Sequence, residues 1–497
     1  MNKSFYITTT LPYVNADPHV GFAMEFIRAD VIARAKKLEG YDVFFNTGTD
    51  EHGQKLFDAA AKEGKDVKAY VDEFAERFRG LKDVLGISDD VHFIRTTDIK
   101  HEKIAQDFWM RCFNNGYIEK RKYTASYCIG CEEAKTESDL VNGECPDHPG
   151  QKLEILEEEN YFFKYSAFTD RINDFYKKNP DFVVPDFRFN EIKLFAQNGL
   201  QDFSISRLKT KMNWGISVPN DPEHVMYVWF DALTNYISTL ADDSVETLED
   251  LIKSEKFQQY WVHGTPIQYC GKNNLRFQAA MWQAMLMAAE VPNSQQIIIN
   301  GFITADGGLK MSKSIGNVVN PYDVVAEYGT DALRYFLLAE CSSFEDSPFT
   351  MERFKESYNA KLANGIGNLA SRVLKMSQNY NFEYQKEIKF KESVFAKEHD
   401  EFYKLYKKGL DSYNLKLSMD MVWACINWAD KYVQQEEPFK LIKIDQAKAK
   451  YVIEILLSDL MQISEMLEPF MPETSKKIKN ALLENKMLEQ PLFLRKD

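Results

Sequence analysis

The loop at residues 11–22 (LPYVNADPHVGF) joins a strand pattern to a helical one, and it constrains the fold of this chain more than any other feature. Residues 5–10 predict an apolar strand, residues 20–38 predict a helix that stops before Gly40, and residues 43–48 predict a second strand. The sequence therefore predicts a βαβ unit. Its loop lies where a helix N-terminus can receive an anion.

A second loop, far along the chain, carries side chains that can bind phosphate. Residues 310–314 read KMSKS and follow an apolar run at residues 296–303 and a glycine-rich turn. A loop of this kind can carry ammonium groups to a triphosphate and withdraw again. In this order, the two loops resemble the HIGH and KMSKS signatures of class I aminoacyl-tRNA synthetases. The residues around them resemble those of the methionyl-tRNA synthetases.

The resemblance implies an ATP site shared by the two loops. His19 stands at the first histidine of HIGH, where it would bind phosphate, whereas Phe22 replaces the second histidine. The ammonium of Lys313 would follow the β- and γ-phosphates as the pentacoordinate phosphorus forms, with Lys310 in support. Taken alone, the first loop could be a polar connection with His19 as a helix cap. The implied catalytic residues are His19, Lys310 and Lys313, and the implied ATP-binding residues are His19, Gly21, Lys310, Ser312 and Lys313.

Three of the seven cysteines are clustered with a histidine, in two short pairs separated by 13 residues. The pairs are Cys128 with Cys131, and Cys145 with His148. This spacing is typical of a tetrahedral Cys₃His zinc knuckle, in which four protein ligands leave no open position. The cluster predicts one structural Zn²⁺. The alternative is a chance grouping of cysteines in a loop.

The resemblance also implies a methionine-binding site. Asp50, in TGTDEHG after the second predicted strand, would receive the ammonium group of the amino acid, with Arg207 as its ion-pair partner. Arg207 could instead form a surface salt bridge, and the aromatic residues could be ordinary core. Asn273 and Gln278 replace the aspartate and histidine usual in the family. The implied methionine-binding residues are Leu11, Tyr13, Asp50, Arg207, Trp229, Ala232, Tyr236, Asn274, Gln278 and Trp282.

The order of the parts implies an α/β class I synthetase. We expect a Rossmann-like catalytic domain in two halves, residues 1–115 and 226–303, with a connective insertion bearing the zinc knuckle at residues 116–225. The KMSKS loop and a stem-contact region would occupy residues 304–350. From residue 351 to residue 497 the pattern is helical, with few prolines, and predicts an α-bundle of about five helices that binds the anticodon.

Four residues of the helical part are candidates for anticodon contact. Asn364, Asn368 and Arg372 recur every four residues, so they would share one face of a helix. The resemblance implies that this face meets the CAU anticodon and that Phe439, after Pro438, stacks on a base. The alternative is a plain solvated face.

The implied activity is that of a methionine–tRNA ligase, with tRNA(Met), ATP with Mg²⁺, and L-methionine as partners. The net charge of −14 does not exclude tRNA, because local basic patches suffice for phosphate contacts. We expect no membrane contact and a cytoplasmic location, because no apolar run approaches the roughly 20 residues of a span and no secretory leader is visible. We expect a monomer, since no dimerising appendix follows residue 497. The alternatives are another class I synthetase, such as one for cysteine or leucine, and a non-catalytic tRNA-binding paralogue.

Overall fold

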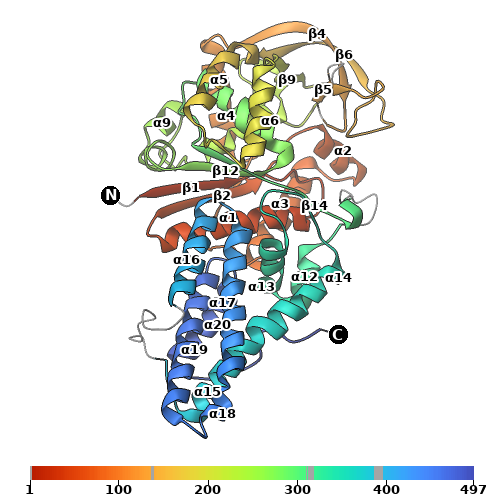
Figure 1. Cartoon of the computed structure of the whole chain (residues 1–497). Helices are drawn as coiled ribbons and strands as arrows, with labels where there is room; N and C mark the ends of the chain where they lie inside the picture. The colour runs from red at the N-terminus through yellow and green to blue at the C-terminus, as the bar shows by residue number, and fades with distance from the viewer. Residues whose placement is uncertain are drawn as a thin grey trace. The chain divides into compact units, whose positions relative to one another are not determined.

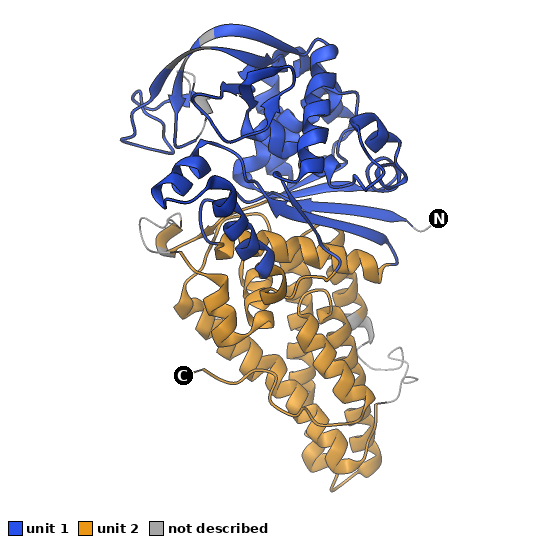
Figure 2. Ribbon diagram, turned by 180° about the vertical axis from the view of Figure 1, so that it is seen from behind, with its two compact units in different colours: residues 1–17, 40–80, 90–299 blue, residues 18–39, 81–89, 300–497 orange. Residues whose placement is uncertain are grey.

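In the computed structural model, the chain divides into two units that each draw on several stretches of sequence (Figure 2). Unit 1 comprises residues 1–17, 40–80 and 90–299, and unit 2 comprises residues 18–39, 81–89 and 300–497. The structure describes residues 3–131, 133–135, 139–308, 311, 318–384 and 396–496.

Unit 1 is built on a six-stranded sheet with the strand order β3-β2-β1-β12-β13-β7 (Figure 1). Strand β1 pairs in parallel with β2 on one side and with β12 on the other. Parallel pairs also join β2 to β3 and β13 to β7. The strands are β1 (Ser4–Thr9), β2 (Asp42–Thr49), β3 (His92–Arg95), β7 (Val183–Val184), β12 (Pro266–Gly271) and β13 (Gln296–Asn300).

The predicted βαβ unit is confirmed. The chain runs from β1 through helix α1 (Val20–Leu38) to β2, and the two strands are parallel neighbours. Five of the six residues of β1 are buried, as expected for a parallel strand covered on both faces. The next strand in the chain, β2, lies on one side of β1, and β12 lies on the other. The strand order therefore reverses at β1. Ligands of open α/β sheets bind beyond the carboxyl ends of the strands at such a point.

The aromatic core of unit 1 packs on this sheet. Tyr6 of β1 lies 5.9 Å from the Trp261 ring, and Trp282 lies 5.7 Å from Phe108, centroid to centroid. The helices of this unit, apart from short 3₁₀ and π segments, are α2 (Gln54–Lys62), α3 (Val67–Val84), whose last turn belongs to unit 2, α4 (Ile99–Asn114), α5 (Thr169–Lys178), α6 (Asp186–Gln197), α7 (Val228–Leu233), α8 (Asn235–Ser238), α9 (Leu248–Lys253), α10 (Glu255–Phe257) and α11 (Trp282–Ala288).

Two small sheets lie between residues 118 and 226. One is antiparallel, with the order β5-β4-β6-β8, and Figure 1 labels its strands β4, β5 and β6. Its strand β4 ends at Cys128. The other has the order β10-β11-β9. Strand β7 comes from the same stretch of sequence but forms the edge of the parallel sheet. The bounds are β4 (Ile118–Cys128), β5 (Glu133–Lys135), β6 (Glu154–Phe163), β8 (Phe203–Ser204), β9 (Ser206–Leu208), β10 (Ser217–Val218) and β11 (Asp221–Met226).

Unit 2 is mainly helical, apart from the short parallel pair β14 (Ile303–Thr304) and β15 (Ser347–Pro348). Among its described residues from 351 onward, five α-helices have twelve residues or more, which confirms the predicted bundle. The helices of the unit after α1 are α12 (Pro321–Tyr328), α13 (Thr330–Tyr335), α14 (Met351–Ser357), α15 (Asn368–Tyr380), α16 (Ala396–Asp411), α17 (Leu415–Glu436), α18 (Pro438–Leu441), α19 (Gln446–Leu467) and α20 (Pro472–Leu483).

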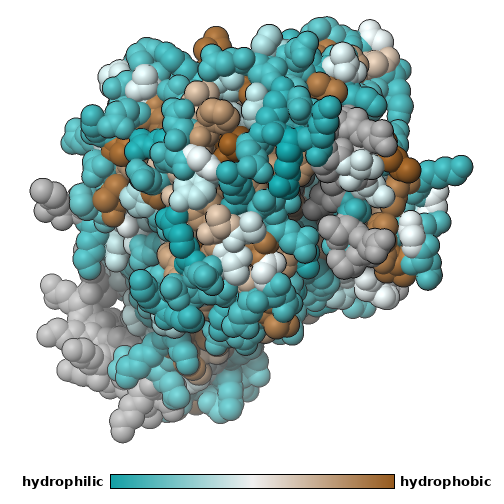
Figure 3. All heavy atoms as spheres, turned by 90° about the horizontal axis from the view of Figure 1, so that it is seen from above, coloured by the Kyte–Doolittle hydropathy of each residue, from teal (hydrophilic) through white to brown (hydrophobic). Residues whose placement is uncertain are grey.

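The surface seen in Figure 3 is mostly hydrophilic, with hydrophobic residues in small groups. In the part of the chain that the structure describes, no helix has both the length and the apolarity needed to cross a membrane.

A buried ion pair joins distant segments of unit 2. The carboxylate of Asp30, in α1, lies 2.9 Å from Nη2 of Arg334, in α13, and both side chains have 0% exposure. Arg334 also donates to the carbonyl oxygens of Phe470 (2.7 Å) and Leu85 (3.0 Å). Burial raises the pKa of Asp30, but the guanidinium groups of Arg334 and Arg34, with hydrogen bonds from Ser88, outweigh burial, and the pKa lies below its usual value.

We expect Asp30→Ala to destabilise unit 2 by about 3–5 kcal/mol, because it leaves a buried guanidinium without its carboxylate. Urea unfolding followed by circular dichroism measures this loss. The control is Lys416→Ala, which breaks the exposed pair with Asp420 (2.8 Å) and should cost less than about 1 kcal/mol. Equal losses in the two variants would contradict the role given to the buried pair.

Candidate functional site

The carboxyl ends of three neighbouring strands bring four of the predicted methionine-binding residues to one edge of the sheet. Leu11 and Tyr13 follow β1, Asp50 follows β2, and Asn274 follows β12. Tyr13 and Asp50 form a parallel bridge, with the Asp50 amide donating to the carbonyl of Pro12 (2.9 Å). Asn274 Nδ2 donates to Thr10 Oγ1 (3.3 Å), so the segments after β1 and β12 are also joined.

A second group of predicted residues surrounds Tyr236. Its hydroxyl accepts a hydrogen bond from Gln278 Nε2 (2.5 Å), and its ring lies 6.0 Å from that of Trp282. Residues 277–281 form a π-helical turn that leads into α11, a feature common at functional sites. In the described structure, Gln278 Oε1 and Trp282 Nε1 are buried without a hydrogen-bond partner. Unsatisfied buried groups of this kind are rare in folded proteins.

Helix α7 contributes Trp229 and Ala232 to the predicted pocket. The Trp229 ring stacks on Phe277, with the centroids 3.9 Å apart and the planes 7° from parallel. This contact links α7 to the turn that carries Gln278. Sequence reasoning missed Phe277. An aromatic directly before Gln278 was the signal that could have found it.

Arg207 is buried in unit 1. Its guanidinium donates to Ser204 Oγ (2.9 Å) and to the Ser206 carbonyl (2.8 Å). It also lies 5.0 Å from the ring of Tyr127 and 5.4 Å from that of Tyr227. A surface salt bridge therefore does not describe this side chain. The ion pair with Asp50 stays a prediction.

His19 is the N-cap of α1, and its Nδ1 accepts a hydrogen bond from the Gly21 amide (3.1 Å). A Cβ on Gly21 would lie 2.9 Å from the His19 ring, so glycine keeps room for this arrangement. The Phe22 ring lies 6.0 Å from that of Phe26. The predicted ATP ligands Lys310, Ser312 and Lys313 lie outside the described residues.

The four predicted metal ligands lie together beside the end of β4. Their ligand atoms, three Sγ atoms and a ring nitrogen of His148, are all within 4.8 Å of one another. Sγ of Cys131 is 3.4 Å from Sγ of Cys145 and 3.3 Å from His148 Nδ1, and Cys128 Sγ is 3.7 Å from Nδ1. Zn–S bonds of about 2.3 Å and Zn–N bonds of about 2.0 Å in a tetrahedron require ligand separations of roughly 3.5–3.8 Å. The cluster therefore fits a tetrahedral metal.

Gly130 allows the four ligand residues of the cysteine cluster to lie close together. A Cβ at this position would lie 2.4 Å from the ring of His148, so only glycine allows the imidazole to approach the Cys128–Cys131 turn this closely. The tight packing indicates a structural site.

The predicted anticodon residues lie in unit 2. Asn364 and Asn368 are exposed, but a kink at Gly365 (φ −89°, ψ −106°), inside the π-helical segment Tyr358–Gly367, separates them. Residues four apart share one face only in an uninterrupted helix, and this helix is interrupted at Gly365. Arg372, in α15, donates to Asp430 Oδ1 of α17 (2.7 Å). Phe439, in α18, is 43% exposed.

Sequence reasoning also missed a polar network beside Asp50. The carboxylate of Glu51 and the ring of His52 are both buried, and each is paired with charged groups from other segments. The sequence DEHG at residues 50–53 contained the signal, because consecutive charged residues directly after a buried strand require partners.

Two family models match the chain. The model of the class I tRNA synthetases (M) matches residues 5–154 and 148–374. The model of the anticodon binding domain of methionyl tRNA ligase matches residues 385–491.

Individual relatives agree over nearly the whole length. The methionine–tRNA ligase of Caldanaerobacter subterraneus subsp. tengcongensis is 40% identical over 483 residues, which cover 96% of this chain and 74% of the relative. That of Brucella suis biovar 1 is 37% identical, with 97% of this chain and 92% of the relative covered.

Solved structures show the same similarity. Mycobacterium tuberculosis methionyl-tRNA synthetase in complex with methionyl-adenylate gives a TM-score of 0.90 at 33% identity, with 100% of both chains covered. Its apo form gives 0.83 at 30% identity, with 100% of this chain and 99% of that chain covered. The predicted class I architecture is thereby confirmed: a Rossmann-like catalytic sheet, an insertion with the cysteine cluster, and a helical anticodon-binding part. The chain belongs to the methionyl-tRNA synthetases, the methionine–tRNA ligases of class I.

Proposed function

We propose that this methionine–tRNA ligase activates L-methionine with ATP to methionyl-adenylate and pyrophosphate, and then transfers the methionyl group to the 3′ end of tRNA(Met). The observation that carries the proposal is the convergence of Leu11, Tyr13, Asp50 and Asn274 at the carboxyl ends of β1, β2 and β12. Ligands of this kind of sheet bind at that edge.

The proposed methionine site divides into a polar and an apolar part. Asp50 receives the ammonium group, and Arg207 completes the charge balance. Trp229, Tyr236 and Trp282 surround the thioether, for which polarisable aromatic faces are suitable contacts. Leu11, Tyr13, Ala232, Asn274 and Gln278 complete the pocket. The buried Gln278 Oε1 and Trp282 Nε1 support a ligand here, because both lack a partner within the described structure.

The proposed ATP site combines His19, Gly21, Lys310, Ser312 and Lys313, with Mg²⁺ bound to the nucleotide as part of the substrate. His19 Nδ1 is held by the Gly21 amide, which orients the imidazole at the N-terminus of α1. Helix N-termini favour anions, so a phosphate is the expected occupant. Lys313, with Lys310, stabilises the charge that develops on the triphosphate.

The Cys₃His cluster holds one structural Zn²⁺ through Cys128, Cys131, Cys145 and His148. Zinc is the metal that tetrahedral thiolate and imidazole ligands favour. A bound ion cross-links the end of β4 to the segment at residues 145–148.

Anticodon reading is assigned to Asn364, Asn368, Arg372 and Phe439. Exposed amides can hydrogen-bond to base edges, and an exposed aromatic ring can stack on an unpaired base. The division into residues 1–115, 116–225, 226–303, 304–350 and 351–497 is part of the same proposal. A monomeric state and a cytoplasmic location stay predictions, which light scattering and cell fractionation would test.

We expect ATP–pyrophosphate exchange with methionine to exceed exchange with leucine, isoleucine or cysteine. The margin for the apolar competitors should be moderate, because one methylene in an apolar pocket is worth only about 1–3 kcal/mol. A panel of amino acids at equal concentration measures it. Faster exchange with leucine or cysteine would assign the chain to another class I specificity.

We expect one zinc per chain, lost in Cys128→Ser. Elemental analysis of purified protein measures the metal, and hydrogen exchange should show faster exchange around β4 and β6, because metal binding stabilises this local fold. The control is Cys425→Ala, which removes a buried free cysteine of unit 2 and should keep the zinc. Full zinc content in Cys128→Ser would refute the ligand set.

We expect Phe439→Ala to reduce aminoacylation by about ten- to a hundredfold, because base stacking is worth roughly 1–3 kcal/mol. Pyrophosphate exchange, which needs no tRNA, should stay near normal, and Phe439→Trp should match or exceed the parent in aminoacylation. The control Tyr403→Ala removes an exposed aromatic of α16 and should leave both activities unchanged. Equal loss of both activities in Phe439→Ala would mean that Phe439 supports the fold instead.

A further inference from the structure

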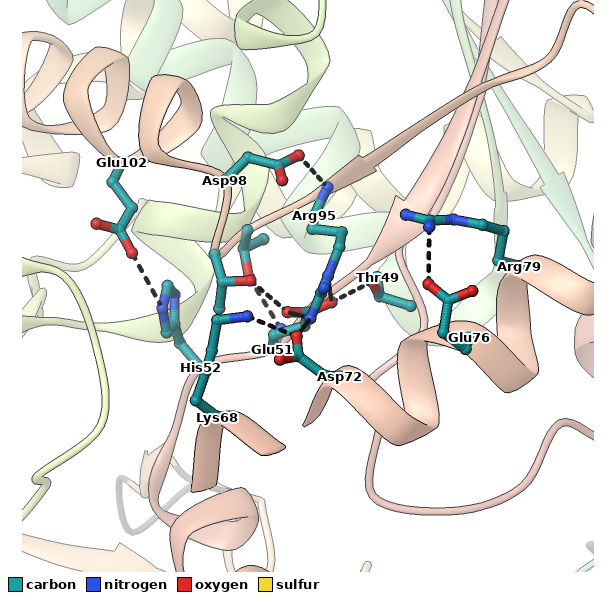
Figure 4. A network of polar contacts seen from close by, with 12 residues as sticks. Thr49, Glu51, His52, Lys68, Asp72, Glu76, Arg79, Arg95, Asp98 and Glu102 are labelled. Carbon is teal, nitrogen blue, oxygen red and sulfur yellow. Dashed lines mark hydrogen bonds and ion pairs between the residues drawn. The ribbon is translucent and has the colours of Figure 1, made fainter. Parts of the chain in front are cut away.

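Glu51, the residue after Asp50, is held by hydrogen bonds to both its side chain and its backbone. The buried carboxylate of Glu51 receives two hydrogen bonds from Arg95, from Nε and Nη2, both at 2.7 Å (Figure 4). Thr49 and Thr97 each donate a hydroxyl to it at 2.5 Å. The Glu51 side chain has 0% exposure. Its bidentate ion pair with Arg95 is therefore shielded from solvent, and charge-assisted hydrogen bonds are strongest in such surroundings.

The backbone of Glu51 is held as well. Its amide donates to Thr96 Oγ1 (2.9 Å), and its carbonyl accepts from Trp214 Nε1 (2.5 Å). The Gly53 amide donates to the carbonyl of Trp214 (3.1 Å). The peptide that follows Asp50 therefore has little freedom to rotate.

The next residue, His52, is tied to helix α7. Its Nδ1 lies 2.7 Å from Asp231 Oδ2, and Nε2 of His101 lies 2.8 Å from Asp231 Oδ1. His101 Nδ1 contacts Ser238 Oγ (2.7 Å), and Glu102 lies 3.8 Å from His52 Nε2 (Figure 4). All three members of the His52–Asp231–His101 cluster are buried.

The charges in this cluster support one another. Burial raises the pKa of Asp231, but the two histidines outweigh burial, and the pKa lies below its usual value. Burial lowers the pKa of His52, but Asp231, together with the more weakly acting Glu102 and Glu51, outweighs burial, and that pKa is raised. Asp231 is thus a carboxylate that holds both rings by charge-assisted hydrogen bonds.

Asp231 lies in the turn of α7 between Trp229 and Ala232. Its bond to His52 therefore connects the segment of Asp50 to the helix that carries two residues of the proposed methionine pocket. Asp50 itself is anchored through its backbone on the other side, to Pro12 and Val14.

We propose that Glu51, His52 and Asp231 are positioning residues, which fix the direction of the Asp50 carboxylate and its distance from α7. The ammonium-binding and thioether-binding parts of the methionine site then form one rigid body. This inference rests on the proposed function, because it gives the Asp50 carboxylate the ammonium group of methionine as its ligand. The position of such a group matters, since a displacement of about 1 Å can cost roughly 10² in rate.

His52→Ala removes the bond to Asp231, and we expect it to raise the KM for methionine by about tenfold or more, with the KM for ATP changed less than about twofold. His52→Asn should fall between His52→Ala and the parent, because its amide can reach Asp231 from the place of Nδ1. Pyrophosphate exchange at saturating ATP and varied methionine measures the first KM, and the reverse titration measures the second. Thermal unfolding is recorded for each variant.

The control is Tyr406→Phe, which removes a buried hydrogen bond to the carbonyl of Met466 in unit 2 (2.9 Å). It should lower stability without changing either KM, which separates positioning from stability. If His52→Ala does not fold, Asp231→Asn, which keeps the side-chain shape, replaces it with the same expected rise. The inference is overturned if the folded variant has the same KM for methionine as the parent. It is also overturned if the KM for methionine and the KM for ATP rise equally. Absence of methionine-dependent exchange in the parent would instead refute the proposed function.

Discussion

The parallel pairing of β1 with both β2 and β12 is the constraint on which the site depends. The register matches Ile7 with Phe45 on one side and with Ile267 on the other, so the carboxyl ends of three strands reach the same edge. Parallel strands cannot be joined by a tight turn, and the segments after them therefore come from distant parts of the sequence. A one-residue slip would turn the side chains of a strand to the opposite face. The sheet thus determines which residues can meet at the site.

Buried ion pairs join separate segments within each unit. In unit 1, Glu51 and Asp231 are buried carboxylates with cationic or histidine partners on separate elements, and in unit 2 Asp30 plays the same role for Arg334. Replacing such pairs with apolar residues is often neutral for stability, so stability alone does not explain them. They do require one arrangement of the segments that supply the partners. In unit 1, those segments flank Asp50, whose carboxylate is proposed to bind the ammonium group of the substrate.

Local patterns in the sequence predicted the features that depend on interactions between residues close together in the chain. Helix α1 has the predicted bounds, the four metal ligands converge, and the helical part from residue 351 is present, because periodicity and ligand spacing act over a few residues. The contacts of His52 were beyond such reasoning, since Asp231 is 179 residues away. The π-helical turn at Phe277–Met281 and the kink at Gly365 were missed for a related reason. Tertiary packing, rather than the propensity of the segment, selects such irregular turns.

The ion pair of Arg372 with Asp430 bears on the proposed reading of the anticodon. A guanidinium that contacts a base must share or leave its carboxylate partner. The two side chains are 33% and 35% exposed, and pairs at this level of exposure are worth only about 0–1 kcal/mol. A contact with a base edge, worth roughly 1–3 kcal/mol of discrimination, exceeds that cost. The pair is therefore compatible with the proposed contact of Arg372 with a base, and the kink at Gly365 separates Asn364 from Asn368 on the same proposed surface.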